Sequence, residues 1–173
     1  AESIFFERLR LALTDVEDAY DVVILDTPPS LGFLTLGAIY AATGLLVTVH
    51  PAMLDVMSMS QFLLMMGDLI SVIRDAGATM KQDFLRYVVT RHDPFDQSQV
   101  RVVTMLRHLF TEDVLTATAI ASAAIETAGL AKRTLYELEP GNISAATTKR
   151  ARESIDAVND QILALVLQAW GRA

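Results

Sequence analysis

The sequence contains no cysteine, and this absence excludes several kinds of site. Disulfide bonds, thiolate metal ligands and iron–sulfur clusters all need cysteine. The sequence also has no run of about 18 uncharged apolar residues, so no segment predicts a membrane-spanning helix. Nothing near Ala1 resembles a signal peptide. Together these absences favour a cytoplasmic protein in a reducing compartment, with no membrane partner.

Glycine is scarce, and the eight glycines form no phosphate-binding loop of the Walker type. Such a loop, Gly-x-x-x-x-Gly-Lys followed by Ser or Thr, surrounds phosphates with backbone N–H groups and a lysine. None of the eight glycines is followed by lysine. The chain therefore has no phosphate cradle of this kind.

Basic side chains are outnumbered, and the net charge of −7 argues against a protein that coats nucleic acid over its whole surface. The charges are distributed unevenly along the chain. Residues 1–80 carry three basic and ten acidic side chains, whereas residues 81–152 carry ten basic and eight acidic. An anionic partner is therefore expected to meet the second half of the chain.

Composition and pattern predict one α/β domain over residues 1–173. Short apolar runs predict buried strands at residues 22–25, 45–49, 84–90 and 114–120. Apolar side chains at helical spacing predict helices over 2–19, 34–42, 55–76, 98–110, 123–128 and 145–170, with Gly44, Gly77 and Gly129 ending three of them. Strands that alternate with helices predict a mostly parallel sheet flanked by helices.

Asp26 directly follows the apolar run at residues 22–25, and Pro28 and Pro29 then stop both strand pairing and immediate helix formation. Ligands of parallel sheets bind at the carboxyl ends of the strands. Asp26 is therefore a candidate Walker B carboxylate, which supports a magnesium ion beside nucleotide phosphates. Two other roles are open here, a turn cap and a phosphorylated aspartate, although the proline pair has no function in the latter.

Residues 20–31, Tyr-Asp-Val-Val-Ile-Leu-Asp-Thr-Pro-Pro-Ser-Leu, closely resemble the second switch of the ParA family of deviant-Walker ATPases. Members of that family segregate plasmids and chromosomes. Three later segments resemble the family in the same order: residues 48–51 (Thr-Val-His-Pro), residues 88–93 (Val-Val-Thr-Arg-His-Asp), and Tyr136-Glu137 with the helix that follows. Residues 93–98, Asp-Pro-Phe-Asp-Gln-Ser, are most similar to the RepA-like ATPases of repABC plasmids. The resemblance covers essentially the whole chain.

The resemblance implies a P-loop NTPase-like fold with a site for ATP or ADP and Mg. Asp26 is then the catalytic Walker B aspartate, which holds Mg through water, and Thr27 and Pro28 lie on the nucleotide side. Arg91 and Asp93 would flank the adenine and the dimer interface, because a guanidinium can stack on a base and a carboxylate can accept from an exocyclic amine. A solvated loop is the alternative for Arg91 and Asp93.

The departure from the family is the missing P-loop, so the segment resembles the family's carboxyl-terminal portion, incomplete at the N-terminus. We expect that the isolated 173-residue chain does not hydrolyse ATP, although a full family member would. The alternative function is a non-catalytic DNA- or partner-binding module derived from the same fold.

Lys149, Arg150 and Arg152 form a basic cluster in the first turns of the last predicted helix. The helix dipole disfavours cations there by roughly 0.3–1 kcal/mol each, so another role would explain them. In the ParA family, basic residues near the carboxyl end bind DNA nonspecifically, and the resemblance assigns that role to these three. A solvated basic face is the alternative.

The resemblance also implies a homodimer, a centromere-binding partner of the ParB/RepB type and association with the nucleoid. Membrane-associated division-site ATPases are a related class, and they end in an amphipathic basic helix. The present chain instead ends Trp-Gly-Arg-Ala after an apolar helix face, which favours core packing.

Overall fold

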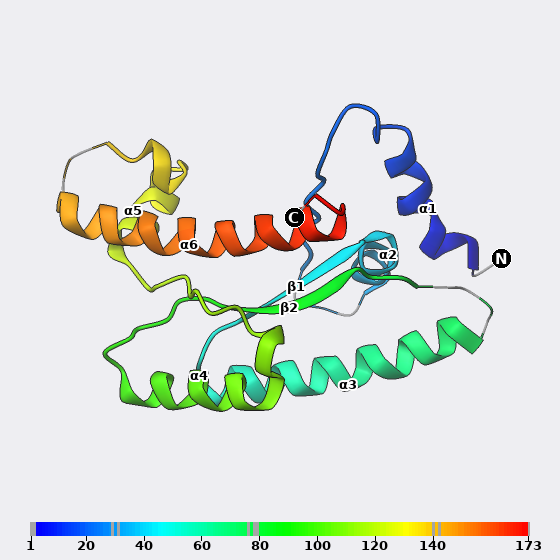
Figure 1. The fold of residues 1–173 in the computed structure, drawn as a ribbon, viewed down its shortest axis with the longest axis horizontal. Coiled ribbons are helices and arrows are strands. Elements are labelled where there is room, and N and C mark those ends of the chain that lie inside the picture. The colour runs from blue at the N-terminus through cyan, green and yellow to red at the C-terminus, as the bar shows by residue number, and fades with distance from the viewer. Residues whose placement is uncertain are drawn as a thin grey trace. The chain divides into compact units, whose positions relative to one another are not determined.

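The computed structural model describes residues 3–28, 30, 32–75, 77, 80–139, 141 and 143–172. The chain forms two compact units, one made of residues 1–45 and 59–84 and the other of residues 46–58 and 85–173. The elements run α1 (Ser3–Thr14), α2 (Phe33–Ala41), β1 (Gly44–Val49), α3 (Met53–Asp75), β2 (Phe84–Val89), α4 (Gln97–Phe110), η1 (Thr111–Asp113), α5 (Ala123–Leu130), η2 (Leu135–Glu137) and α6 (Ala145–Ala169) (Figure 1). The α/β class is confirmed, with β1 and β2 as a parallel pair. The single domain over residues 1–173 stays a prediction.

In the first unit, α1 packs against α2, whose apolar sequence is buried around most of its circumference. Gly44 opens β1 directly over the ring of Phe84, and a Cβ on this glycine would lie 2.3 Å from the ring carbon Cζ. Only glycine allows that approach without displacing the ring. The backbone continues the contact, since the Asp83 N–H donates to the Thr43 carbonyl at 2.7 Å.

Residues 22–25 do not form the buried strand that their apolar run predicts, so that prediction was wrong. The segment is extended, but none of the described residues pairs with it. Val22, Val23 and Ile24 are 52%, 47% and 88% exposed. Local sequence favours an extended backbone, whereas a strand also needs a neighbour that satisfies its N–H and C=O groups and covers its side chains.

In the second unit, β2 is covered on both faces. Val88 packs with the α6 side chains of Val158 and its apolar neighbours, Ile155, Ile162 and Leu165. The adjacent Tyr87 points the other way and stacks on Phe110 of α4, with ring centroids 4.5 Å apart. Figure 1 accordingly shows α6 on one side of the strand pair and α4 on the other. This two-sided burial is what a continuous apolar strand sequence predicts.

Residues 114–120 run parallel to β2 but form two isolated bridges, Tyr87 with Val114 and His92 with Ile120, in place of the predicted strand. The N–H groups of Leu115 and Ala119 donate to the Tyr87 and Val89 carbonyls at 2.9 Å, but side chains take backbone groups of the residues between them. The Arg107 guanidinium donates to the Thr116 carbonyl at 2.6 Å, and the Ala117 N–H donates to the side chain of Gln161 at 3.3 Å. These contacts interrupt the ladder that the apolar sequence would otherwise continue.

Three glycines were predicted to end helices, and the structure confirms this for one of them. Gly77 ends α3 as predicted, with φ of 86° and an N–H bond to the Arg74 carbonyl. Gly44 instead begins β1, because Ala42 already caps α2, and Gly129 lies inside α5. The first helix stops at Thr14 and does not reach residue 19. No helix in the described ranges is long and apolar enough to cross a membrane.

Candidate functional site

Asp26 lies in the first unit, in the extended segment that runs from residue 22 to residue 28. Its side chain is exposed, and within the described part of the chain no hydrogen bond or ion pair engages its carboxylate. Thr27 and Pro28 are exposed beside it. The buried Thr35 hydroxyl of α2 donates to the Pro28 carbonyl at 3.5 Å, which ties this turn to a helix in the same unit.

The donor set around Asp26 limits what metal it could hold. Among the described residues, no three His, Asp or Glu side chains lie together as a metal site. Magnesium is often bound by one or two carboxylates, with waters and substrate phosphates completing its shell. A lone exposed carboxylate fits that kind of ion. Pro29 and Leu31, which belong to the same sequence motif, lie outside the described residues.

Arg91 and Asp93 lie in the second unit, on the loop between β2 and α4, and both side chains are exposed. Arg91 has φ of 52°, in the left-handed region that few non-glycine residues adopt. The Asp93 carboxylate accepts the Phe95 N–H at 2.9 Å, and the Asp93 N–H donates to Gln99 at 2.8 Å. The loop therefore holds these two predicted residues in a defined conformation, and they belong to the second unit whereas Asp26 belongs to the first.

His92 lies between them and is buried, at 9% exposure. Its Nδ1 is 3.1 Å from the Thr118 hydroxyl, and its buried Nε2 has no hydrogen-bond partner among the described residues. Burial lowers the pKa of His92 below its ordinary value, and the nearby Arg107 lowers it further, against a smaller opposite effect of Asp93. The imidazole therefore favours its neutral form.

The three predicted DNA-binding cations have three different environments. Lys149 pairs with Glu153 at 3.7 Å, and both side chains are exposed. The Arg150 guanidinium lies over the ring of Phe95, 5.2 Å from its centroid. Arg152 is partly buried and donates to backbone carbonyls of the η2 segment. The sequence groups these residues into one cluster, whereas their contacts separate them.

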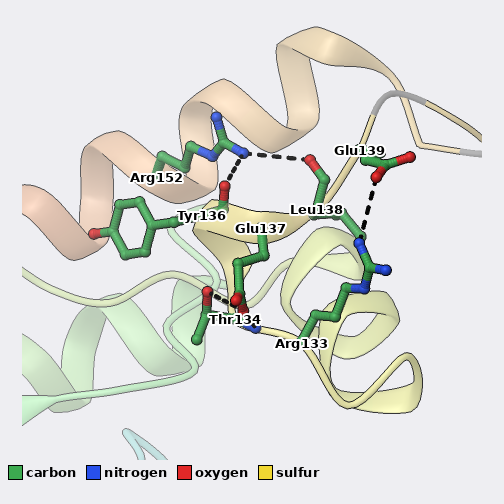
Figure 2. A network of polar contacts seen from close by, with 7 residues as sticks. All are labelled: Arg133, Thr134, Tyr136, Glu137, Leu138, Glu139 and Arg152. Atoms are coloured by element: carbon green, nitrogen blue, oxygen red, sulfur yellow. Dashed lines mark hydrogen bonds and ion pairs between the residues drawn. The ribbon is translucent and has the colours of Figure 1, made fainter.

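Arg152 is the centre of the polar network drawn in Figure 2. Its guanidinium reaches the carbonyls of Leu135 at 3.1 Å, Tyr136 at 3.1 Å and Leu138 at 3.4 Å. The Tyr136 hydroxyl in turn donates to Asp156 of α6, which raises the pKa of Tyr136 above its usual value. These bonds hold η2 against the first turns of α6.

A capping box closes the same segment at its other end. The Glu137 carboxylate accepts from both the N–H and the hydroxyl of Thr134 at 2.8 Å, and these bonds lower the pKa of Glu137. Arg133 adds an exposed ion pair with Glu139 at 3.4 Å. The segment 133–139 is thus ordered by its own side chains as well as by Arg152 (Figure 2).

Sequence reasoning missed the residues that fix the β2–α4 loop: Phe95, Gln99 and Thr118. One signal was available, because Asp96 lies two residues before the predicted helix start at residue 98 and Asp is a favoured N-cap. Its carboxylate accepts the Ser98 N–H at 2.8 Å, as a cap does. The contacts of Phe95 and Thr118 join distant parts of the chain, so no local pattern predicts them.

Comparison with known proteins gives consistent results. A family model described as an AAA domain matches residues 3–76. Proteins named "Putative replication protein A" are similar along nearly the whole chain: that of Rhizobium rhizogenes is 47% identical over 171 residues, covering 99% of this chain and 42% of the relative. That of Sinorhizobium fredii is 46% identical over 168 residues, covering 97% of this chain and 41% of the relative.

A shorter part of the chain is similar to a protein whose name assigns it to the ParA family. The "Virulence plasmid ParA family protein pGP5-D" of Chlamydia psittaci is 42% identical over 59 residues, which is 34% of this chain and 23% of the relative. Among solved structures, one titled "Partition Protein" matches with a TM-score of 0.67 at 18% identity, over 93% of this chain and 39% of that one.

This chain spans about two fifths of the length of the replication-protein relatives. Their similarity covers nearly all of it, and the solved partition protein shares its fold. The chain is therefore ParA-like in sequence and in fold.

Proposed function

We propose that the chain is part of a ParA-type partition ATPase, which dimerises around ATP and Mg, binds DNA nonspecifically and responds to a centromere-binding partner of the ParB/RepB type. The observation that carries the proposal is the exposed Asp26 carboxylate at the end of an apolar extended segment, in a ParA-like chain. A protein of this kind acts on nucleoid-associated DNA in the cytoplasm.

Asp26, Thr27, Pro28, Arg91 and Asp93 are the residues that we assign to nucleotide binding. Asp26 holds Mg through water, and Thr27 and Pro28 form the adjoining turn. Arg91 and Asp93 contribute a guanidinium and a carboxylate to the nucleotide base and the dimer interface. The bound Mg would neutralise charge that develops on the transferred phosphate. Since the chain has no Gly-Lys loop, the phosphates themselves need a cradle that these 173 residues do not contain.

The DNA contact uses the more basic second half of the chain. Lys149 and Arg150 are exposed on the first turns of α6. Arg152 belongs to the same proposed cluster, but its donors already bond to three carbonyls, so its share in phosphate contact is expected to be the smallest. Neutralising all three should weaken DNA binding by the full-length protein and flatten its salt dependence. An unchanged salt slope would contradict the assignment.

The test of the nucleotide site is Asp26→Asn in the full-length protein, assayed for magnesium-dependent ATP hydrolysis. Loss of the carboxylate should lower turnover at least about tenfold, or ~1.4 kcal/mol of transition-state stabilisation. Asp21→Asn is the matched control, because Asp21 is an exposed acid that directly precedes the same extended segment. Full activity of the Asp26→Asn protein, or an equal loss in the control, would refute the role.

The absence of a Gly-Lys loop favours one alternative, a non-catalytic module that binds DNA or a protein partner. To distinguish the partition ATPase from the non-catalytic module, ATP turnover has to be measured both for the isolated 173-residue chain and for the full-length protein. We expect no ATP turnover from the isolated chain and magnesium-dependent turnover from the full-length protein. DNA binding by the full-length protein without turnover would instead support the module.

A further inference from the structure

Phe95 is an unusually exposed aromatic residue with a specific partner. It lies on the β2–α4 loop, and 75% of its surface is exposed. One face of its ring is occupied by the Arg150 guanidinium from α6, at 5.2 Å from the ring centroid. A guanidinium within about 6 Å of an aromatic face is attracted by the ring quadrupole. The pair therefore links two elements that are 55 residues apart in sequence.

The loop holds the ring in a defined place. The Phe95 N–H is bonded to the Asp93 carboxylate at 2.9 Å. On the other side, Asp96 accepts from both the N–H and the hydroxyl of Ser98, at 2.8 and 2.6 Å, where α4 begins. These bonds fix the backbone on both sides of residue 95, so the Phe95 side chain starts from a defined position beside Arg150.

Of the three cations in its cluster, Arg150 is also the one without a carboxylate or carbonyl partner among the described residues. Lys149 is paired with Glu153, and Arg152 is bonded to carbonyls of the η2 segment. In the part of the chain that the structure describes, the Arg150 guanidinium has no carboxylate or carbonyl partner. The contact with the ring uses none of the guanidinium N–H groups as donors to a carbonyl or carboxylate, so they can donate to an anion.

We propose that Phe95 is a positioning residue, which holds Arg150 in the orientation that contacts a DNA phosphate. The β2–α4 loop, which also carries Arg91 and Asp93, is then part of the DNA-binding surface. This inference rests on the proposed function of nonspecific DNA binding. It names a residue for that surface that carries no charge and lies outside the basic cluster.

The experiment measures DNA affinity by fluorescence anisotropy, with the full-length protein, ATP, Mg and a duplex of arbitrary sequence. Phe95→Ala should weaken binding about two- to five-fold, the range expected from an exposed cation–π contact. Phe95→Trp should retain the affinity, because it keeps an aromatic face. Phe95→Leu should behave like alanine, because it keeps apolar bulk without one.

A double-mutant cycle makes the test specific. Arg150→Gln should weaken binding, and adding Phe95→Ala to it should cause no further loss, since the ring acts through the arginine. The chain offers a matched control in Trp170 and Arg172, whose guanidinium lies 5.3 Å from the indole centroid near the other end of α6. Trp170→Ala should leave DNA affinity unchanged.

The outcomes separate this inference from the proposed function. If Lys149→Gln and Arg150→Gln weaken binding but Phe95→Ala does not, or if its effect persists in the Arg150→Gln background, the positioning role is overturned and the DNA surface stands. If neither cation matters, the DNA surface fails and the positioning role fails with it. Unchanged urea midpoints for the Phe95 variants show that folding is not the cause.

Discussion

At the scale of single residues, the first turns of α6 show how little a residue type says about its role. Lys149, Arg150 and Arg152 are near neighbours with the same charge. They nevertheless contact a carboxylate, an aromatic ring and a set of backbone carbonyls. The helix dipole disfavours all three cations, and the contact of Lys149 with Glu153 is an i,i+4 pair within α6 itself, so the dipole argument leaves their role a prediction. The partner of each depends on what lies opposite its own face of the helix.

His92 gives a prediction at this scale, through the pH dependence of stability. Its folded pKa is lowered by burial and by Arg107, so the unfolded chain takes up the proton first as pH falls. The free energy of unfolding should therefore decrease as pH drops below about 6.5, the ordinary histidine value, toward the folded pKa. Above about 6.5 this contribution is complete. Urea unfolding between about pH 5.5 and pH 7.5 measures it.

His92→Gln should flatten that dependence, whatever it does to stability at neutral pH. His108→Gln is the control, because His108 is exposed near the end of α4 and should leave the pH dependence in place. An identical pH profile for the wild type and for His92→Gln would show that the buried imidazole does not control it.

At the scale of elements, Arg152 joins η2 to α6. A guanidinium that donates to three carbonyls contributes charge-assisted hydrogen bonds, and deleting it leaves partly buried acceptors unsatisfied. Arg152→Ala should lower the free energy of unfolding by about 1–3 kcal/mol. Arg152→Lys should recover a part of this, because an ammonium cannot span the same acceptors as a planar fork.

The matched control for Arg152 is Arg150→Ala, since Arg150 has no backbone acceptor in the described contacts. Urea unfolding monitored by circular dichroism gives both values. Equal losses for the two alanine variants would contradict the role of Arg152 in holding η2.

Elements that depend on local sequence were predictable. The helix α4 follows from its apolar spacing and its Asp96 cap, and β2 follows from a short run that is covered on both faces. The interrupted pairing of residues 114–120 with β2 was not predictable. Arg107 and Gln161 take backbone groups of this run from nine and 44 residues away, and no pattern within the run contains them.

At the scale of the whole molecule, the exposed apolar segment at residues 22–25 is the main departure from the predicted fold. An extended apolar chain with unpaired backbone groups is a site for self-association. Ile24→Lys should therefore reduce aggregation of the isolated 173-residue chain, measured by light scattering, without lowering its thermal midpoint. Ile24 is 88% exposed and has little packing to lose.

The same substitution separates the isolated chain from the full-length protein. If the segment is covered by another strand there, Ile24→Lys places a charge in a buried site and should lower the thermal midpoint. Leu130→Lys is the control, because Leu130 is 87% exposed at the end of α5. Aggregation of the isolated chain that is unchanged by Ile24→Lys would show that the segment is not the cause.

The sequence by itself determined the α/β class, most helices, both strands of the sheet, and the resemblance that the comparisons bear out. These follow from apolar period and short motifs, which are local properties. Only the tertiary structure decided that residues 22–25 pair with none of the described residues, that the pairing of residues 114–120 with β2 is interrupted, and that Lys149, Arg150 and Arg152 have three kinds of partner. The physical reason is the same in each case: strand pairing and side-chain contacts depend on groups that the fold brings from distant positions in the chain.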